Sequence, residues 1–132
     1  MENFTEIAKQ TLERDNGFIK NNDYRVIKVE QNFCILEGNI TESSKNYLGI
    51  VHGGYIFGLV DTAAGIAAMT NNIKVVTLDA NINYFKPVSG EKIFAKAEVI
   101  KKGKTISVYD VLVSDNDDNL LAKATITYFT IG

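Results

Sequence analysis

A single carboxylate lies inside the most apolar segment of the chain, and the residues before it are suited to acyl-transfer chemistry. The only histidine, His52, is followed by Gly53 and Gly54 and then by an apolar run that contains Asp61. A helix that begins at the glycines exposes unpaired backbone N–H groups and positive dipole potential in its first turn. Because glycine lets a ligand oxygen approach closely, this turn has the geometry of an oxyanion hole. The alternative is a plain tight turn that leads into the helix.

The surroundings of Asp61 make it a candidate general base. Helical spacing puts Gly58, Asp61, Gly65 and Ala68 on one stripe of small residues around one acid. Each glycine inside a helix costs about 1 kcal/mol relative to alanine, so the stripe predicts the close approach of another backbone or a ligand. A carboxylate with restricted access to water is a candidate base with a shifted pKa. The alternatives are exposure to solvent and capping of a second helix that begins at Thr62.

The spacing of the two groups indicates a site shared between subunits. Gly54 and Asp61 are seven residues apart, which is about 10 Å along a helix. A base must act within about 3 Å of the reacting group or through one water. One helix therefore cannot easily place both groups on one reacting atom, whereas two copies that run antiparallel across a two-fold axis can.

The elements that position these residues follow from the hydrophobic periodicity. A short amphipathic helix is predicted at residues 3–14 and a long apolar helix at about residues 53–70. The residues predicted to pack this helix on a sheet are Ile56, Leu59, Val60, Ala63, Ile66 and Ala67. Strands are predicted at residues 24–30, 33–40, 75–85, 92–101, 105–114 and 120–131. This order predicts a single α+β domain over residues 1–132, with one long helix against an antiparallel sheet.

Composition argues against several classes of function. The 132 residues carry 14 Lys and Arg and 16 Asp and Glu, a net charge of −2, whereas nucleic-acid-binding proteins are usually basic. One cysteine, Cys34, and one histidine allow no internal disulfide and do not make a zinc site, and Cys34 is predicted to be a buried inert thiol. The N-terminus has no apolar signal core, and residues 53–69 are too short and too interrupted for a membrane span. We therefore expect a cytoplasmic soluble protein without metal, nucleic acid or membrane.

Several stretches together resemble a known family. Residues 46–54 (NYLGIVHGG), followed by residues 61–65 (DTAAG), resemble the hotdog-fold acyl-CoA thioesterases of the phenylacetate-pathway type, in the 4-hydroxybenzoyl-CoA thioesterase superfamily. Residues 81–87 (NINYFKP) resemble the family's strand that ends in an aromatic residue, a basic residue and proline. Residues 101–104 (KKGK) and 107–111 (SVYDV) resemble its basic hairpin, and the match covers nearly the whole chain in order.

The resemblance implies a fold and an assembly. The hotdog fold is a long central helix wrapped by a curved antiparallel sheet, here of about five to six strands with a short N-terminal helix. Its members resemble one another in forming dimers or tetramers with active sites at the subunit interface. A homodimer, or a dimer of dimers, is therefore expected.

The resemblance also implies catalytic roles for the matching residues. Gly53 or Gly54 would polarise the thioester carbonyl through its backbone N–H, and Asp61 of the partner subunit would act as general base on water or as nucleophile. Asn46 would bond the thioester or orient the loop, and His52 would order the loop or contact the thioester. The alternative for both of these side chains is hydrogen bonding within the loop.

Further residues match positions that hold water or substrate in the family. Thr77 matches a serine or threonine that holds the water in some members. The residues implied to meet the phosphates of coenzyme A are Lys86, Lys101, Lys102, Gly103 and Lys104. The alternative for the lysine turn is a solvated hairpin that protects a sheet edge.

The expected function is hydrolysis of an acyl- or aryl-CoA thioester to the free acid and CoA, with a small-molecule substrate and no cofactor besides the CoA that the substrate carries. One alternative is a hotdog hydratase or dehydratase, which pairs a catalytic histidine with an acid, although His52 lies in the HGG turn. A non-catalytic acyl-CoA-binding protein is a second alternative, although no DNA-binding segment is left over. A purely structural oligomer is a third, and it has no obvious use for Asp61.

Overall fold

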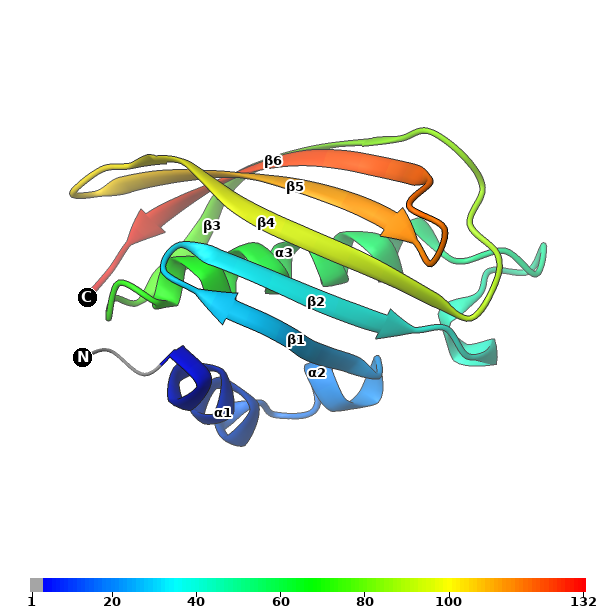
Figure 1. Ribbon diagram of the computed structural model, residues 1–132, viewed down its shortest axis with the longest axis horizontal. Coiled ribbons are helices and arrows are strands. Elements are labelled where there is room, and N and C mark those ends of the chain that lie inside the picture. Colours follow the sequence, from blue (N-terminus) through cyan, green and yellow to red (C-terminus); the bar gives the residue numbers. More distant parts are fainter. Residues whose placement is uncertain (1–3) are drawn as a thin grey trace.

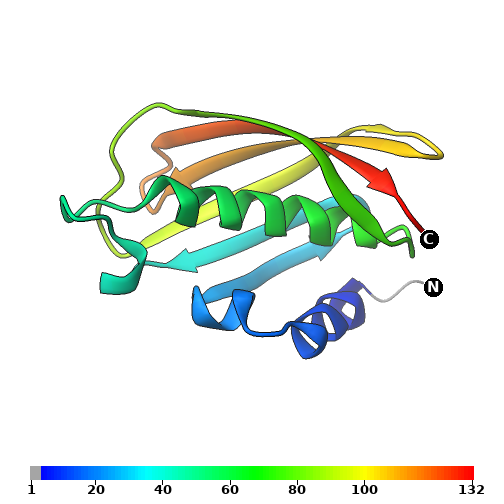
Figure 2. The ribbon, with the colours of Figure 1, turned by 180° about the vertical axis from the view of Figure 1, so that it is seen from behind.

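A 17-residue helix, α3, lies along one face of a six-stranded antiparallel sheet in the computed structural model, which describes residues 4–132 (Figures 1 and 2). The helices are α1 (Phe4–Arg14), α2 (Phe18–Asn21) and α3 (Gly53–Met69), with a 3-10 turn, η1 (Glu42–Ser44), before α3. The strands are β1 (Tyr24–Glu30), β2 (Phe33–Asn39), β3 (Val75–Tyr84), β4 (Lys92–Lys102), β5 (Ile106–Asp115) and β6 (Leu120–Thr130). The predicted long helix and all six predicted strands are confirmed to within a residue at each end.

The order of the strands makes β3 an edge strand. The sheet runs β1-β2-β4-β5-β6-β3, and each neighbouring pair is antiparallel. β3 follows α3 in the chain and pairs with β6, the last strand. The strands before and after α3 thus belong to one sheet. The outer edge of β3 pairs with no strand of residues 4–132. No helix within those residues has both the length and the hydropathy to cross a membrane.

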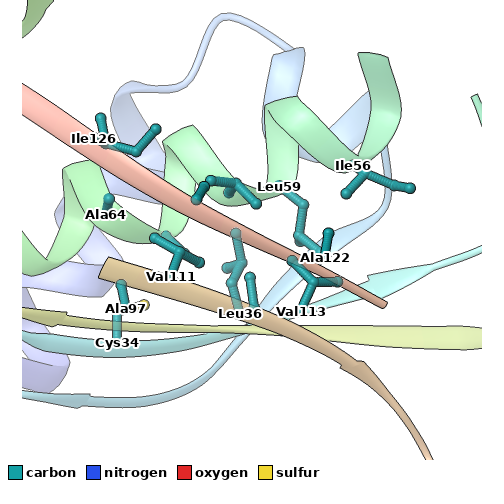
Figure 3. Packing of buried hydrophobic residues seen from close by; sticks show 14 of the residues in the cluster. Cys34, Leu36, Ile56, Leu59, Ala64, Ala97, Val111, Val113, Ala122 and Ile126 are labelled. Carbon is teal, nitrogen blue, oxygen red and sulfur yellow. The ribbon is translucent and has the colours of Figure 1, made fainter. Parts of the chain in front are cut away.

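The core lies between α3 and the inner face of the sheet. All six residues predicted to pack α3 on the sheet are buried, as predicted. Figure 3 shows Ile56 and Leu59 on the side of α3 that faces the strands, opposite Val113 of β5. Alanines on the inner faces of β4 and β6 leave room for this close approach. These alanines are Ala95, Ala97, Ala122 and Ala124.

Cys34 is buried, as predicted, and its environment makes the thiol inert. Its side chain lies on β2 within the core and has no exposed surface (Figure 3). Burial raises the pKa of the Cys34 thiol to about 12. The reactive thiolate is therefore suppressed at neutral pH.

Two local features differ from the sequence prediction. The segment between the predicted N-terminal helix and the first predicted strand contains a short helix, α2. The side chain of Asp15 accepts hydrogen bonds from the backbone nitrogens of Gly17 and Ile19, at 3.1 and 3.0 Å, at the start of this helix. Residue 3, the first of the predicted N-terminal helix, lies outside the described residues, and α1 begins at Phe4.

Gly58 has its close neighbours within the chain. A Cβ at this position would lie 2.6 Å from the Tyr24 hydroxyl and 2.9 Å from the Phe18 ring. The Tyr24 hydroxyl donates a hydrogen bond of 2.7 Å to the carbonyl of Tyr55, so it cannot move away freely. The expectation that another backbone or a ligand approaches the stripe is therefore wrong at Gly58, since side chains of β1 and α2 occupy that space.

Candidate active site

The carboxylate of Asp61 is held at one oxygen and open at the other. Asp61 lies in the middle of α3 and is half-buried. Its Oδ1 accepts a hydrogen bond of 2.8 Å from the Thr77 hydroxyl and one of 2.9 Å from the Tyr128 hydroxyl. Its Oδ2 accepts no hydrogen bond from the described residues. The structure thus places Thr77 beside Asp61 and leaves Oδ2 available to another molecule.

Two neighbouring strands supply the two hydroxyl groups. Thr77 of β3 and Tyr128 of β6 lie directly opposite each other in the antiparallel register. The register of β3 shifts immediately after Thr77, at a β-bulge, and such bulges often re-aim side chains beside active sites. Burial, and then the negative charge of Asp61, raise the pKa of Tyr128, so its hydroxyl stays protonated as a hydrogen-bond donor.

Tyr128 is the residue that sequence reasoning missed. Its position in a strand is typical of a core aromatic residue, and its ring is indeed buried at 3% exposure. Finding Tyr128 would have required the register between β3 and β6, which places it opposite Thr77. That register is set by tertiary packing and the bulge, so the local sequence does not show it.

At the start of α3, one of the two glycine N–H groups is occupied. His52 is the N-cap residue, and its Nδ1 accepts a hydrogen bond of 2.8 Å from the backbone nitrogen of Gly54. This bond requires a lone pair on Nδ1, so the neutral ring carries its proton on Nε2. The backbone N–H of Gly53 has no hydrogen-bond partner among residues 4–132. Of the two candidate donors for a carbonyl oxygen, Gly53 is therefore the open one.

Asn46 shapes the loop that leads to this turn. Its side-chain Oδ1 accepts hydrogen bonds from the backbone nitrogens of Leu48 at 2.9 Å and Ile50 at 3.4 Å. Its Oδ1 is thus engaged within the loop, whereas its Nδ2 donates no hydrogen bond to the described residues. The tip that it supports carries Tyr47, which is 95% exposed, and Leu48.

Lys86 lies near the open glycine. A cavity of about 290 Å³ beside the start of α3 is lined by residues of α3 and of the segment that follows β3. The lining residues are Val51, Gly53, Ile56, Tyr84, Phe85, Lys86, Pro87 and Val88. The Tyr84 hydroxyl donates a hydrogen bond of 3.0 Å to the carbonyl of Gly53, which fixes the end of β3 against the helix start.

The lysine hairpin lies at the opposite end of the sheet from Lys86. Lys101 and Lys102 end β4, and Gly103 and Lys104 lie in the turn to β5, whereas Lys86 lies in the connection from β3 to β4 (Figure 1). Gly103 donates a backbone hydrogen bond of 2.9 Å to Ile106, and a Cβ at Gly103 would collide with that same carbonyl oxygen. Glycine is thus required by the turn itself, and the chain does not bring Lys101, Lys102 and Lys104 together with Lys86.

The two halves of the candidate site are apart within one chain. Gly53 and Asp61 both lie on α3, eight residues apart, which is about 12 Å along the helix. The carboxylate with its two hydroxyls forms one group, and the open N–H with the cavity near Lys86 forms the other. The first group can accept a proton from a water molecule. The second group can donate a hydrogen bond to an oxygen that gains negative charge.

The chain belongs to the thioesterase superfamily, whose family model matches residues 48–122. The PaaI protein of the phenylacetic acid degradation operon of Escherichia coli has a TM-score of 0.92 and 25% identity, over 98% of this chain and 94% of its own. The smu.793 protein of Streptococcus mutans UA159, solved bound to acetyl CoA, has a TM-score of 0.79 and 33% identity, over 83% of this chain and 89% of its own. Mouse acyl-coenzyme A thioesterase 13 is 34% identical over 67% of this chain and 66% of its own. The predicted hotdog fold and the enzyme class, a thioester hydrolase, are confirmed.

Proposed function

We propose that the protein hydrolyses acyl- or aryl-CoA thioesters to the free acid and CoA. The observation that carries this proposal is the carboxylate of Asp61, held at Oδ1 by two hydroxyls and open at Oδ2. Two comparisons support acyl-CoA as the substrate class. One relative is named acyl-coenzyme A thioesterase 13, from mouse, and the S. mutans protein was solved with acetyl CoA.

In the proposed reaction, Asp61 acts as general base. Its Oδ2 takes a proton from water, and the water oxygen forms a bond to the thioester carbon. The charge that develops on the carbonyl oxygen is stabilised by the backbone N–H of Gly53 and by the positive end of the α3 dipole. The C–S bond then breaks, and CoA leaves as a thiolate that takes up a proton. A single turnover in ¹⁸O-labelled water distinguishes base from nucleophile, because a nucleophilic Asp61 would put an unlabelled protein oxygen into the first product.

The proposed site is assembled from two subunits in a homo-oligomer, a dimer or a dimer of dimers. The Gly53 N–H of one subunit would meet Asp61 of the partner subunit, which removes the separation of about 12 Å along one helix. The edge strand β3 supports such an assembly, since Val76 is 46% and Leu78 is 58% exposed. Exposed apolar side chains on an unpaired strand edge favour association with another chain.

Within one chain, Lys86 and the hairpin lysines lie at opposite ends of the sheet (Figure 1). In the proposed assembly, the phosphates of CoA would therefore be bound by Lys86 of one subunit and by Lys101, Lys102 and Lys104 of the partner subunit, with Gly103 shaping the lysine turn. The chemistry uses side chains and backbone alone, so dialysis against a metal chelator is expected to leave the activity unchanged. A cytoplasmic location is part of the same proposal, because acyl-CoA is an intracellular substrate class.

The test is thioester hydrolysis against a panel of aryl- and fatty-acyl-CoAs, with free CoA detected by a thiol reagent. The Asp61→Asn variant keeps the shape of the side chain and removes the base, so turnover should fall by at least about 10²-fold. Asp110→Asn is the matched control, because Asp110 also accepts a hydrogen bond of 2.8 Å from a threonine hydroxyl, that of Thr125, but lies in β5, away from Asp61. Normal turnover in a folded Asp61→Asn protein would sink the proposal.

A further inference from the structure

We propose that Tyr128 is a positioning residue for catalysis, because its hydroxyl fixes the carboxylate of Asp61 so that Oδ2 faces the reacting water. This inference rests on the proposed function, and it assigns a role to a residue that no motif in the sequence indicates.

The Tyr128 ring is fixed from several sides. It lies on β6 in the interior of the sheet, with Thr77 of β3 opposite it on one side and Ser107 of β5 on the other. The ring of Tyr109 meets it edge-on, with 6.1 Å between the ring centroids. A ring so enclosed presents its hydroxyl at one place, and a carboxylate bonded there takes one orientation.

The Tyr128 hydroxyl lies against the turn of α3 that contains Gly65. A Cβ at Gly65 would be 3.6 Å from the Tyr128 hydroxyl oxygen, so the hydroxyl lies directly against this turn of α3. Within the same turn it is 2.7 Å from the main-chain carbonyl oxygen of Asp61 and 2.9 Å from Oδ1. The hydroxyl oxygen therefore lies within hydrogen-bond distance of both the carboxylate and the main-chain carbonyl of Asp61.

Having two acceptors keeps the Tyr128 hydroxyl satisfied through a catalytic cycle. The hydroxyl has one proton, which can point to Oδ1 or to the carbonyl oxygen of Asp61. When Asp61 is ionised, the negative oxygen is the stronger acceptor. When Asp61 holds a proton from water, the carbonyl oxygen remains as a partner. Proton uptake at Oδ2 thus leaves no buried hydroxyl without a hydrogen bond, which would otherwise cost free energy.

Thr77 cannot supply the same constraint alone. Thr77 is exposed and lies on the edge strand, next to the bulge, where the ladder on its outer side has no partner among residues 4–132. Tyr128 is buried and its strand is paired on both sides. The carboxylate of Asp61 thus has two hydroxyl partners, and Tyr128 is the one that is held in place by its surroundings.

The first experiment compares Tyr128→Phe with Tyr109→Phe by steady-state kinetics. Both variants remove one hydroxyl from a buried tyrosine of the inner face, but the Tyr109 hydroxyl bonds Asn32 at 2.8 Å and does not touch Asp61. Tyr128→Phe should lower kcat by about tenfold or more, because a hydrogen bond to a charged group is lost, with KM within about twofold of wild type. Tyr109→Phe should retain kcat. Equal kcat values for wild type and a folded Tyr128→Phe protein would overturn the inference.

The second experiment does not require activity. The side-chain carboxyl carbon of Asp61 is followed by ¹³C NMR at neutral pH, and its signal is assigned through Asp61→Asn. Because the Tyr128 hydroxyl hydrogen-bonds this carboxylate and the Tyr109 hydroxyl does not, the signal should move in Tyr128→Phe and stay in place in Tyr109→Phe. An unmoved signal in Tyr128→Phe contradicts the inference.

The outcomes separate this inference from the proposed function. If wild type hydrolyses none of the thioesters, the proposed function fails, and the carboxyl-carbon signal of Asp61 still reports whether Tyr128 fixes the carboxylate. If Tyr128→Phe does not fold, the ring-carbon signal of Tyr128 is compared between Asp61→Asn and Asp110→Asn in the otherwise unchanged protein. A signal that moves in Asp61→Asn and not in Asp110→Asn supports the contact, and a signal that is unmoved in both overturns it.

Discussion

The imidazole Nδ1 of His52 lies 2.8 Å from the backbone nitrogen of Gly54 and accepts its hydrogen. One of the orphan N–H groups at the start of α3 is therefore satisfied by the residue that precedes the helix, while that of Gly53 stays open. In the proposed site, the histidine of the HGG turn would thus leave Gly53 rather than Gly54 to meet a substrate oxygen.

The cap can be tested by comparing His52→Ala with His52→Asn. Loss of an N-cap acceptor costs about 1 kcal/mol of stability, so His52→Ala should lower the free energy of unfolding by that order. Asparagine is a good N-cap residue, so His52→Asn should retain most of the stability. Urea unfolding at neutral pH measures both. Indistinguishable unfolding of His52→Ala and wild type would show that the bond does not stabilise the helix.

The shared site predicts complementation between two inactive variants. Gly53→Val blocks the approach of a carbonyl to the backbone N–H, and Asp61→Asn removes the base. In a mixed dimer with the site made by two subunits, one site receives both defects and the other receives neither. Random subunit exchange should therefore restore about a quarter of wild-type activity. Demonstrated exchange without recovered turnover would place both groups of each site in one chain.

The lysine hairpin predicts a substrate-dependent effect on KM. Lys102→Ala combined with Lys104→Ala should raise KM for acyl-CoA, and the effect should weaken as salt rises, since exposed charges are screened. Short thioesters that lack the nucleotide should be unaffected. Lys20→Ala with Lys28→Ala, on α2 and β1, provides a control for loss of positive charge elsewhere. Equal KM changes for both substrate types would identify the hairpin lysines as solvated turn residues.

The two glycines in the interior of α3 should respond in opposite ways to alanine. Gly58→Ala forces its Cβ against the Tyr24 hydroxyl and the Phe18 ring, so we expect a loss of about 1–3 kcal/mol. Gly65→Ala places its Cβ at ordinary contact distance from Tyr128 and gains helix propensity, so stability should rise by up to about 1 kcal/mol. Thermal unfolding of both variants tests the contrast, and the prediction fails if Gly58→Ala is as stable as wild type.

Alkaline pH should destabilise the fold through its buried tyrosines. Burial, together with the charges of Asp23 and Glu37, raises the pKa of Tyr55 to about 12, and burial raises the pKa of Tyr109 to about 12. An unfolded tyrosine ionises near pH 10, so the unfolded chain loses these protons first. Stability is therefore fully present below about pH 10 and falls as pH rises toward about 12. Unfolding midpoints measured across this range should decline, and a flat profile would contradict the burial of these phenols.

The sequence was sufficient for the elements because their signals are local. The alternation in each strand and the apolar stripe of α3 gave bounds that the structure matches closely. Helix α2 was missed because its four residues are too few to show a helical period. Its start is held by local hydrogen bonds to the side chain of Asp15, which hydrophobic periodicity does not report.

The site was predictable only where a residue's type and its neighbours in sequence define its chemistry. Asp61 stood out as a lone acid among apolar residues, and the HGG turn marked the start of the helix. The choice between Gly53 and Gly54 depended on the rotamer of His52, and the role of Tyr128 depended on a cross-strand register. The small-residue stripe misled at Gly58, because a glycine signals a close approach without telling which partner makes it.

The open edge of β3 also has a consequence for solubility. Its ten residues present unpaired backbone groups beside the apolar side chains of Val76 and Leu78, and such an edge can recruit strands from unrelated or misfolded chains. An assembly that covers the edge would protect against aggregation as well as complete the site. A substitution that weakens the assembly should then show itself first as insoluble protein, before any loss of activity per soluble molecule can be measured.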